Sequence, residues 1–420
     1  MSRFPALDSA DFRRYLAGNF LSNAGTHIQT TALAYHVYVL TGSSFMVGLL
    51  GICRVVPLLI FTLFAGVLAD HADRRKVMLG TQSAMALVSL VLAVTEWRAG
   101  VSPALIYVLV AISSIAIAID GPSRQSLVVS LVPEKDFPNA VSIGAIGWRF
   151  AEVIGPVVAG FLMASKGLGF AACYLINSIS FIAVLYAVWR MPPKPPENMD
   201  VADRPQNLSD VLGQIKDGWR FVNNTPVIRH AMWIDFWATF FSTADALLPA
   251  MSEHLKLGPQ GYGMLSSSAA IGAAIAAGVL TFRKTFIMQG AWVVGMVAVY
   301  GFATVMFALS FNPLWAGFFL ALTGAADMVS TVMRQTLRQL STPDSMRGRM
   351  TAISSLFFIS GPRLGDFEAG VVSRAVGDRW SVAIGGLACM GIAVIFSRAK
   401  RLVGYRHGPG QREQDDRPDT

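Results

Sequence analysis

The chain has 420 residues, of which 53% are hydrophobic and only 14% are charged, whereas soluble domains carry about 25% charged residues. Polar side chains are therefore too few to cover a water-soluble protein of this length, and lipid must cover part of the surface. The formal net charge of +8 does not indicate a nucleic-acid partner, because the Lys and Arg residues are spread through short segments between apolar runs. That pattern is typical of loops that face the cytoplasm and its anionic lipids.

Twelve apolar runs follow one another along the chain, and a helix that spans the bilayer needs roughly 20 such residues. The runs cover about residues 15–40, 44–70, 77–97, 103–132, 138–165, 168–190, 226–253, 261–282, 286–310, 313–341, 349–376 and 380–403. No small-residue cleavage pattern follows the first run, so we expect a retained helix and not a signal peptide. The sequence predicts an all-α membrane protein with twelve transmembrane helices.

Lys and Arg residues gather on one set of the loops between these runs. This set includes the segments 74–76, 190–229, 283–284 and 338–349 and the tail from Arg398, whereas the other set holds little beyond Arg98, Lys166, Lys256, Arg374 and Arg379. The positive-inside rule then places both termini in the cytoplasm, and an even number of spans agrees. We expect a multi-pass protein of a bacterial-type inner (plasma) membrane.

The longest connection divides the chain into two parts. It opens with MPPKPPE, which cannot continue a helix, and then carries an amphipathic stretch. The apolar face of this stretch holds Leu208, Val211, Leu212, Ile215, Trp219 and Val222, and it either lies along the membrane surface or packs against helix ends. We expect a six-helix bundle over 1–190, a cytoplasmic linker over 191–225, a second six-helix bundle over 226–405 and a disordered cytoplasmic tail over 406–420.

The two parts repeat each other at a nearly fixed offset. Residues 124–127 read RQSL and residues 334–337 read RQTL, and each is followed at the same spacing by proline and an acid. Gly155 and Gly160 recur as Gly365 and Gly370, and AGVL at 65–68 recurs at 277–280. Such duplication is typical of transporters that bind substrate between their halves. The repeat therefore predicts two pseudo-symmetric bundles around a shared central site.

The loop after the second run holds Gly66, Asp70, Arg74 and Arg75. The glycine lets helices approach closely, the carboxylate can be stabilised by a helix N-terminus or an arginine, and the arginines can anchor the turn at the cytoplasmic face. The alternative is an ordinary basic loop. The corresponding loop of the second half, TFRK at 281–284, lacks the acid.

The fifth run is unusually rich in small residues. It carries Gly144, Gly147, Gly155, Pro156 and Gly160, and such residues make a helix thin enough for close packing whatever the direction of transport.

These motifs resemble those of the major facilitator superfamily. The loop is similar to its signature G-x-L-a-D-r-x-g-R-[RK], with Asp73 where the family often has glycine, and the fifth run resembles in part its antiporter signature. The segments GVLADHADRRKV, RQSLVVSLVP, RQTLRQLSTPDSMRGR and SGPRLGDFEAG resemble its enterobactin-exporter-like branch across both halves. The resemblance implies two six-helix bundles and proton-driven efflux of a siderophore, a drug or another amphiphilic compound.

Ionisable side chains inside these runs are costly, about 2.5–3.5 kcal/mol each on insertion scales, so each needs a partner or a purpose. Arg54 lies in the second run, and Arg363, Asp366 and Glu368 lie in the eleventh. The resemblance places these two helices side by side, so we expect a charge cluster between the bundles that acts as a gate, with substrate contact as the alternative.

Other intramembrane charges have a candidate partner one turn away. Arg149 can pair with Glu152, and Asp120 can pair with Arg124.

A proton carrier is expected among the acids of the runs that line the central cavity in the resembled fold. A carboxylate in a partly dry cavity can load and release protons near neutral pH. Asp235, Asp245 and Asp327 lack an obvious local partner. We expect Asp245 or Asp327 to carry the proton, and Asp120 and Glu152 are the next candidates. For each of the four, the alternative is a water-exposed or salt-bridged side chain without a role in proton transfer.

Four residues are candidates for contact with the substrate. His27 and Gln29 are polar residues in the first run, for which an interhelical hydrogen bond is the alternative. Trp237 and Phe241 lie one turn apart in the seventh run and could stack on a flat ligand, although aromatic residues near helix ends also form interfacial belts.

No motif of an enzyme or a metal site is present. Cys53, Cys173 and Cys389 lie far apart in apolar segments, and the chain has no HExxH, CxxC, nucleotide loop or nucleophile–base set. We expect no catalytic activity, no cofactor and no metal. The expected partners are a small-molecule substrate, protons and the lipid bilayer, for a monomer that does not bind nucleic acid. An importer or facilitator of the same fold is the alternative function, and a membrane-embedded receptor or enzyme is a remote one.

Overall fold

The computed structural model describes residues 4–71, 73–191, 208–243, 245–282, 288–343 and 346–405. Within these ranges every regular element is a helix. The N-terminal half holds α1 (Ala10–Thr41), α2 (Ser44–His71), α3 (Arg74–Ala99), α4 (Pro103–Val129), α5 (Phe137–Ala164) and α6 (Gly169–Trp189). The C-terminal half holds α7 (Leu208–Asn224), α8 (Pro226–Ser242), α9 (Leu248–His254), α10 (Gly258–Thr281), α11 (Gln289–Leu309), α12 (Pro313–Leu340), α13 (Arg347–Val376), α14 (Asp378–Ser397) and α15 (Lys400–Val403).

Polar residues between the apolar runs set where the helices begin and end. The Ser9, Asp73 and Ser102 side chains each accept a backbone N–H in the first turn of α1, α3 and α4, which serves an amide that the helix itself cannot. Gly42 ends α1 with a φ of 61°, a conformation that glycine adopts without steric cost.

Nine helical stretches in the described part of the chain are long and apolar enough to cross a membrane. They belong to α2–α6, α10–α12 and α14. The other three predicted runs correspond to α1, α13 and the pair α8–α9. α1 and α13 have 32 and 30 residues, which is ample length, but polar and charged side chains interrupt them and they contain no sufficiently apolar 18-residue stretch. The count of twelve spans therefore stays a prediction.

The seventh predicted run, 226–253, is not one continuous helix. α8 ends at Ser242, a short 3-10 turn follows at Asp245–Leu247, and α9 begins at Leu248. Side chains from other helices form hydrogen bonds with backbone groups at the break. The backbone N–H of Ala246 donates to the Asp366 carboxylate on α13 at 3.2 Å, and the Tyr300 hydroxyl on α11 donates to the carbonyl of Ser242 at 3.4 Å.

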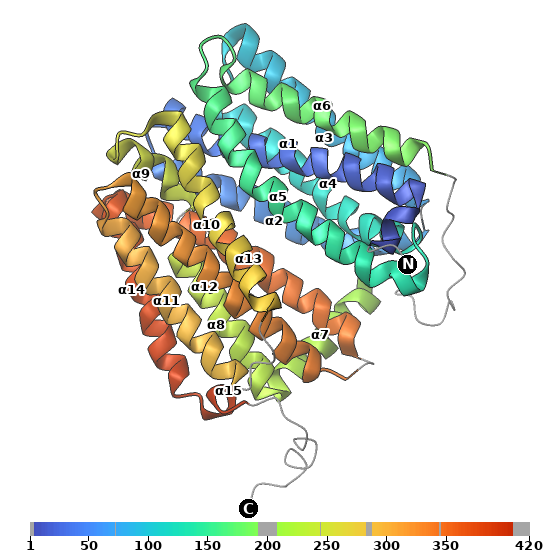
Figure 1. Ribbon diagram of the computed structural model, residues 1–420, viewed down its shortest axis with the longest axis vertical. Coiled ribbons are helices and arrows are strands. Elements are labelled where there is room, and N and C mark those ends of the chain that lie inside the picture. The colour runs from blue at the N-terminus through green and yellow to red at the C-terminus, as the bar shows by residue number, and fades with distance from the viewer. Residues whose placement is uncertain are drawn as a thin grey trace, which may run out of the picture.

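The helices form two groups that meet along two pairs of helices (Figure 1). α1–α6 pack among themselves, as do α8 and α10–α14. Between the groups, α2 packs against α13 and α5 packs against α10. In the C-terminal half, contacts run from α13 to α8, from α8 to α12 and from α12 to α10. α8 and α12 therefore lie between the two helices that have the most extensive contacts with the other half.

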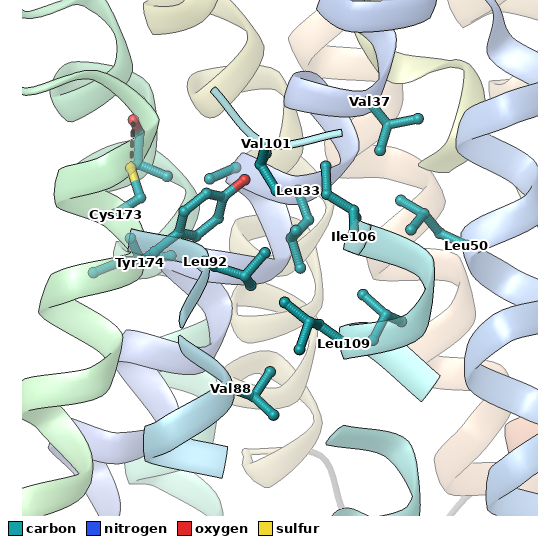
Figure 2. Packing of buried hydrophobic residues seen from close by; sticks show 14 of the residues in the cluster. Leu33, Val37, Leu50, Val88, Leu92, Val101, Ile106, Leu109, Cys173 and Tyr174 are labelled. Atoms are coloured by element: carbon teal, nitrogen blue, oxygen red, sulfur yellow. Dashed lines mark hydrogen bonds between the residues drawn. The ribbon is translucent and has the colours of Figure 1, made fainter. Parts of the chain in front are cut away.

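Apolar side chains fill the interior of each half. In the N-terminal half, Leu92 and Ile106 are fully buried beside Tyr174 and Cys173 (Figure 2). Because lipid is as apolar as leucine, burial from water does not drive this packing inside a bilayer, and close van der Waals fit contributes instead.

Glycines allow the closest helix approaches in the C-terminal half. Gly301 on α11 and Gly386 on α14 face each other, and a Cβ built on either would lie 2.7 Å from the carbonyl oxygen of the other. Only glycine fits at such a crossing, which is the usual device of membrane helix pairs.

α7 packs against the ends of other helices. Val222 is buried with Ile353 and Met350 of α13, and the Trp219 ring stacks on Phe357 with 5.8 Å between centroids. Asp217 forms an ion pair with Arg349 of α13 at 3.6 Å. Of the two arrangements expected for this amphipathic stretch, these contacts correspond to packing against helix ends.

Candidate functional site

The two halves contact each other closely at one end of the molecule, which we call the sealed end. It comprises residues 31–54 and 153–163 of the N-terminal half and residues 246–267 and 363–370 of the C-terminal half. A Cβ on Gly160 would lie 2.8 Å from the carbonyl oxygen of Pro259, and one on Gly370 would lie 2.9 Å from the Cα of Phe45. Gly51 lies equally close to the backbone of Arg363. Glycines therefore let α2 meet α13 and α5 meet α10.

Polar groups of α1 reinforce the sealed end. The Tyr35 hydroxyl donates a hydrogen bond to the Glu253 carboxylate on α9 at 2.6 Å, and its ring stacks on Tyr262 of α10 at 4.9 Å. The Tyr262 hydroxyl in turn donates to the carbonyl of Thr31 at 3.4 Å. Two tyrosines thus link the halves across α1, α9 and α10.

We expect Tyr35→Phe to weaken the sealed end while leaving the ring stack in place. A hydrogen bond to a charged group contributes about 1.5–3 kcal/mol, so the ratio of sealed to unsealed protein should fall by roughly 10- to 150-fold. The measurement is the distance distribution between spin labels on Leu40 and Leu314, one on each half, in a background that lacks the three cysteines. Unchanged distances would show that this hydrogen bond does not hold the halves together.

A group of charges lies beside the sealed end. Arg363 forms an ion pair with Asp366 at 3.4 Å, and Asp366 also accepts the Ala246 amide. Arg54 of α2 interacts electrostatically with both Arg363 and Asp366. The structure thus brings three of the four predicted cluster residues together. Glu368 has no hydrogen bond or ion pair within the part of the chain that the structure describes.

Asp245, at the break between α8 and α9, belongs to the same group of charges. Its side chain is exposed, yet it interacts electrostatically with Arg363 and with Arg54 and Glu152 of the other half. Glu152 is itself paired with Arg149 at 2.7 Å. Asp245 is therefore an accessible carboxylate that faces charges from both halves.

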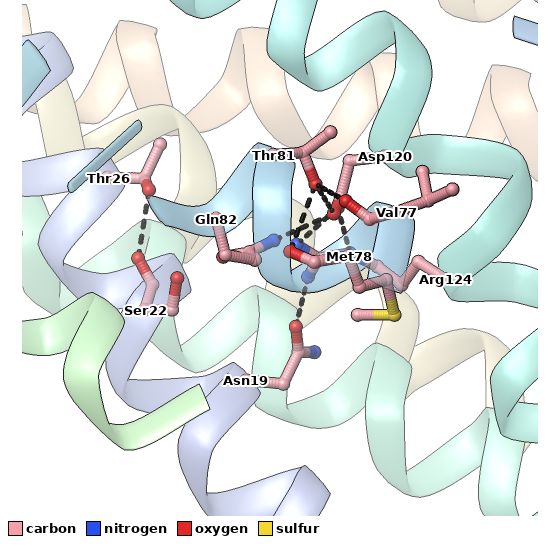
Figure 3. A network of polar contacts seen from close by, with 9 residues as sticks. All are labelled: Asn19, Ser22, Thr26, Val77, Met78, Thr81, Gln82, Asp120 and Arg124. Atoms are coloured by element: carbon pink, nitrogen blue, oxygen red, sulfur yellow. Dashed lines mark hydrogen bonds and ion pairs between the residues drawn. The ribbon is translucent and has the colours of Figure 1, made fainter. Parts of the chain in front are cut away.

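Asp120 lies in a closed polar network of the N-terminal half (Figure 3). Its carboxylate accepts from the Thr81 hydroxyl at 2.8 Å and the Gln82 amide at 3.0 Å, and Arg124 donates to it at 2.8 Å. Arg124 also binds the amide oxygen of Asn19 on α1. Beyond their mutual ion pair, three side chains from two other helices thus satisfy this carboxylate and its arginine.

The repeated arginine of the C-terminal half has a different partner. Arg334 forms an ion pair with Asp235 of α8 at 2.6 Å and lies 3.7 Å from Asp327 of its own helix. Its guanidinium also donates to Ser330 and Thr331. Asp327 is 44% exposed while Asp235 is largely enclosed, so Asp327 is the more accessible of these two acids.

The four predicted substrate contacts lie in different surroundings. Gln29 is buried and accepts the Asn177 amide at 2.9 Å, which is the interhelical bond expected as its alternative. His27 lies edge-on to Trp148 at 5.4 Å. Trp237 and Phe241 stack at 5.8 Å along α8.

The small residues of the fifth run serve helix contacts. Gly155 lies against the His27 backbone of α1, and Gly160 lies against α10. Pro156 is buried beside Gly263, while Gly147 has only the Phe20 ring within 4 Å.

The loop after α2 is only partly described. Gly66 and Asp70 lie outside the residues whose side chains the structure describes. Arg75 donates from Nε to the carbonyl of Val188 at 3.1 Å and also binds the carbonyl of Trp189, so it joins this loop to the last turn of α6, where basic groups stabilise exposed carbonyls. Asp73, where the resembled signature often has glycine, caps α3.

Several long-range pairs were not predicted from the sequence. Tyr35 and Glu253 are 218 residues apart. His36 bonds to the Tyr174 hydroxyl at 2.8 Å and lies 3.5 Å from Glu96. The only sequence signal for such pairs was the presence of isolated polar residues in apolar runs, which does not identify the partner.

Comparison with known proteins gives one family over nearly the whole chain. The model of the family described as "Transmembrane secretion effector" matches residues 1–406. Enterobactin exporter EntS of Escherichia coli strain K12 is 23% identical over 398 residues, which cover 94% of this chain and 92% of that protein. EntS of Salmonella choleraesuis is 24% identical over 391 residues, which cover 92% and 91%.

Solved transporters share the fold. A mutant of the nucleoside transporter NupG superposes with a TM-score of 0.73 at 13% identity and covers 92% of this chain and 99% of its own. A bacterial homologue of the human lysosomal transporter Spinster, inward-facing and occupied, also gives 0.73 at 12% identity, with 98% and 100% covered. These relatives are transporters, which are not enzymes, and they act on small molecules. The chain belongs to the transmembrane secretion effector family and is a multi-pass membrane transporter of the major facilitator superfamily type.

Proposed function

We propose that this protein exports an amphiphilic small molecule, in exchange for protons, by alternating access between its two halves. The observation that carries the proposal is the sealed end: the halves are joined there by glycine crossings, by two tyrosines and by a cluster of apolar side chains around Tyr35. Two halves that are joined by such contacts can move apart as rigid bodies, as expected for transporters built from two repeats. Residues 1–190 and 226–405 are the proposed moving units, each with six spans.

The proposed orientation follows from charge. The sealed end carries α9 and the α13–α14 connection, and the opposite end carries α7 and the arginine-rich segments near residues 74 and 347. The positive-inside rule assigns the arginine-rich end to the cytoplasm, together with both termini. In this orientation the halves are sealed toward the outside of the cell, and the protein acts as a monomer.

We propose Asp245 as the proton carrier. It is exposed, it lies at a helix break, and it faces Arg54 and Glu152 of the other half. A carboxylate in such a place can exchange its proton with each side in turn as the halves move, because its arginine neighbours approach or withdraw. Asp327, Asp120 and Glu152 each already contact an arginine, which favours a structural role for them.

The proposed substrate is a siderophore or a similar amphiphile. Support comes from the curated relatives named enterobactin exporter and from the aromatic ladder of Trp233, Trp237 and Phe241 on α8, which can stack on flat groups.

Inside-out vesicles test the direction and the coupling together. With an acidic lumen, we expect vesicles that hold the protein to accumulate enterobactin, and we expect Asp245→Asn to abolish this accumulation. The variant should still exchange labelled for unlabelled compound without a gradient, because exchange does not need net proton movement. Asp327→Asn is the matched control and should keep the accumulation.

Other outcomes would contradict parts of the proposal. Equal accumulation with and without the pH gradient would remove the proton coupling. Uptake into right-side-out vesicles alone would make the protein an importer. If Asp327→Asn and not Asp245→Asn abolished accumulation, the carrier would be Asp327.

A further inference from the structure

A cavity of about 170 Å³ lies inside the C-terminal half, between α8, α12 and α13. Its lining includes Asp235, Arg334 and Arg338 together with the rings of Phe357 and Phe358. α13, one of the three helices that line the cavity, also packs against α2 of the N-terminal half. The cavity therefore lies beside a helix at which the two halves meet.

The two arginines of the cavity differ in how they are satisfied. Arg334 is 9% exposed and is neutralised by Asp235 at 2.6 Å. Arg338, one turn further along α12, makes no hydrogen bond or ion pair within the described part of the chain. The acid that interacts electrostatically with it is Asp235, which Arg334 already binds. The cavity thus offers one guanidinium with free donors.

The internal repeat shows that this arrangement is not a general feature of the fold. Arg334 corresponds to Arg124 at the offset of 210, and Arg338 corresponds to Val128. In the N-terminal half, the arginine is enclosed by Asp120, Asn19 and their neighbours (Figure 3). Only the C-terminal half has the second arginine, and it lies beside a cavity. The packing that the two halves share therefore does not explain why Arg338 is present.

We propose that this cavity binds a single aromatic ring that carries an acidic group. A cavity of about 150 Å³ holds one benzene ring, so the space fits one ring and not a macrocycle. A guanidinium binds carboxylates through two parallel hydrogen bonds, and Phe358 offers an exposed face against which a ring can stack. The inference rests on the proposed function in that the cavity would hold the acidic aromatic part of the exported molecule.

The test is ligand binding to the full-length protein in lipid nanodiscs, without any gradient. Isothermal titration calorimetry would compare salicylate with salicylamide, which lacks the charge, and with acetate, which lacks the ring. We expect salicylate to bind at least tenfold more tightly than either. Arg338→Gln should weaken salicylate binding at least tenfold and leave salicylamide unchanged, and Arg338→Lys should restore part of the affinity.

Two further variants separate binding from folding. Phe358 is 55% exposed, so Phe358→Ala should fold normally and weaken salicylate binding severalfold. Arg220→Gln removes the same charge from the exposed side of α7 in the same half and should change nothing. Equal affinity for salicylate and salicylamide, or unchanged salicylate binding by Arg338→Gln, would overturn the assignment. If the protein exports enterobactin but does not bind salicylate, the proposed site is wrong and the proposed function stands. If it binds salicylate but exports nothing, the proposed function is wrong and the site stands.

Discussion

Gly51→Val is expected to disfavour closure of the halves at the sealed end and to reduce transport at least fivefold. A Cβ at position 51 would overlap the carbonyl oxygen of Arg363 on α13 and approach the Cβ of Asp366. Added atoms in a tightly packed contact cost about 1–3 kcal/mol. Because the contact joins the two halves, this cost falls on the sealed arrangement alone and shifts the population away from it by roughly 5- to 150-fold.

Two measurements and one control test this prediction. Spin labels on Leu40 and Leu314 report the separation of the halves, and vesicle accumulation reports transport. Gly80→Val makes the same change on α3, where an added Cβ meets no atom within 4 Å, and it should leave both measurements unchanged. If Gly51→Val kept the label distances and the transport rate of the unaltered protein, the α2–α13 contact would not be part of the moving interface.

Arg124→Met is expected to lower the stability of the protein by about 3–5 kcal/mol. Breaking a buried ion pair leaves a charge without compensation, and the Asp120 side chain is only 5% exposed. The remaining donors, Thr81 and Gln82, are neutral and cannot replace the arginine. Thermal unfolding in detergent should show a large drop in Tm, and the double variant Asp120→Asn with Arg124→Met should recover most of it.

The pair Arg149–Glu152 is the matched control in the same half. Its side chains are 39% and 32% exposed, and exposed pairs contribute about 0.2–1 kcal/mol. Arg149→Met should therefore change Tm little. If Arg124→Met and Arg149→Met lowered Tm equally, the network around Asp120 would contribute no more to stability than an exposed ion pair.

The ion pairs that the sequence predicted from local spacing are present in the structure. Asp120 with Arg124 and Arg149 with Glu152 pair within one turn, as their separation predicts. The helical, two-part architecture followed from the apolar runs and the repeat, because both signals extend over many residues.

Contacts between distant helices could not be predicted in this way. The break after Ser242 is capped by Asp366, which is 120 residues from Ala246, so the run 226–253 looked continuous. For Gln29 the sequence offered both a ligand contact and an interhelical hydrogen bond, and it could not identify the partner, Asn177, which is on another helix. The cluster of Arg54, Arg363 and Asp366 was expected only because the resemblance placed α2 beside α13.

The interruption between α8 and α9 has a consequence for how the outer end of the molecule can move. The backbone groups at the break are already served by Asp366 and Tyr300, so a change of angle between the two helices need not expose an unsatisfied amide or carbonyl to lipid. α9 holds the N-terminal half through Glu253, whereas α8 packs with α13 and α14. The angle between α8 and α9 can therefore change while α9 keeps its hydrogen bond to the N-terminal half.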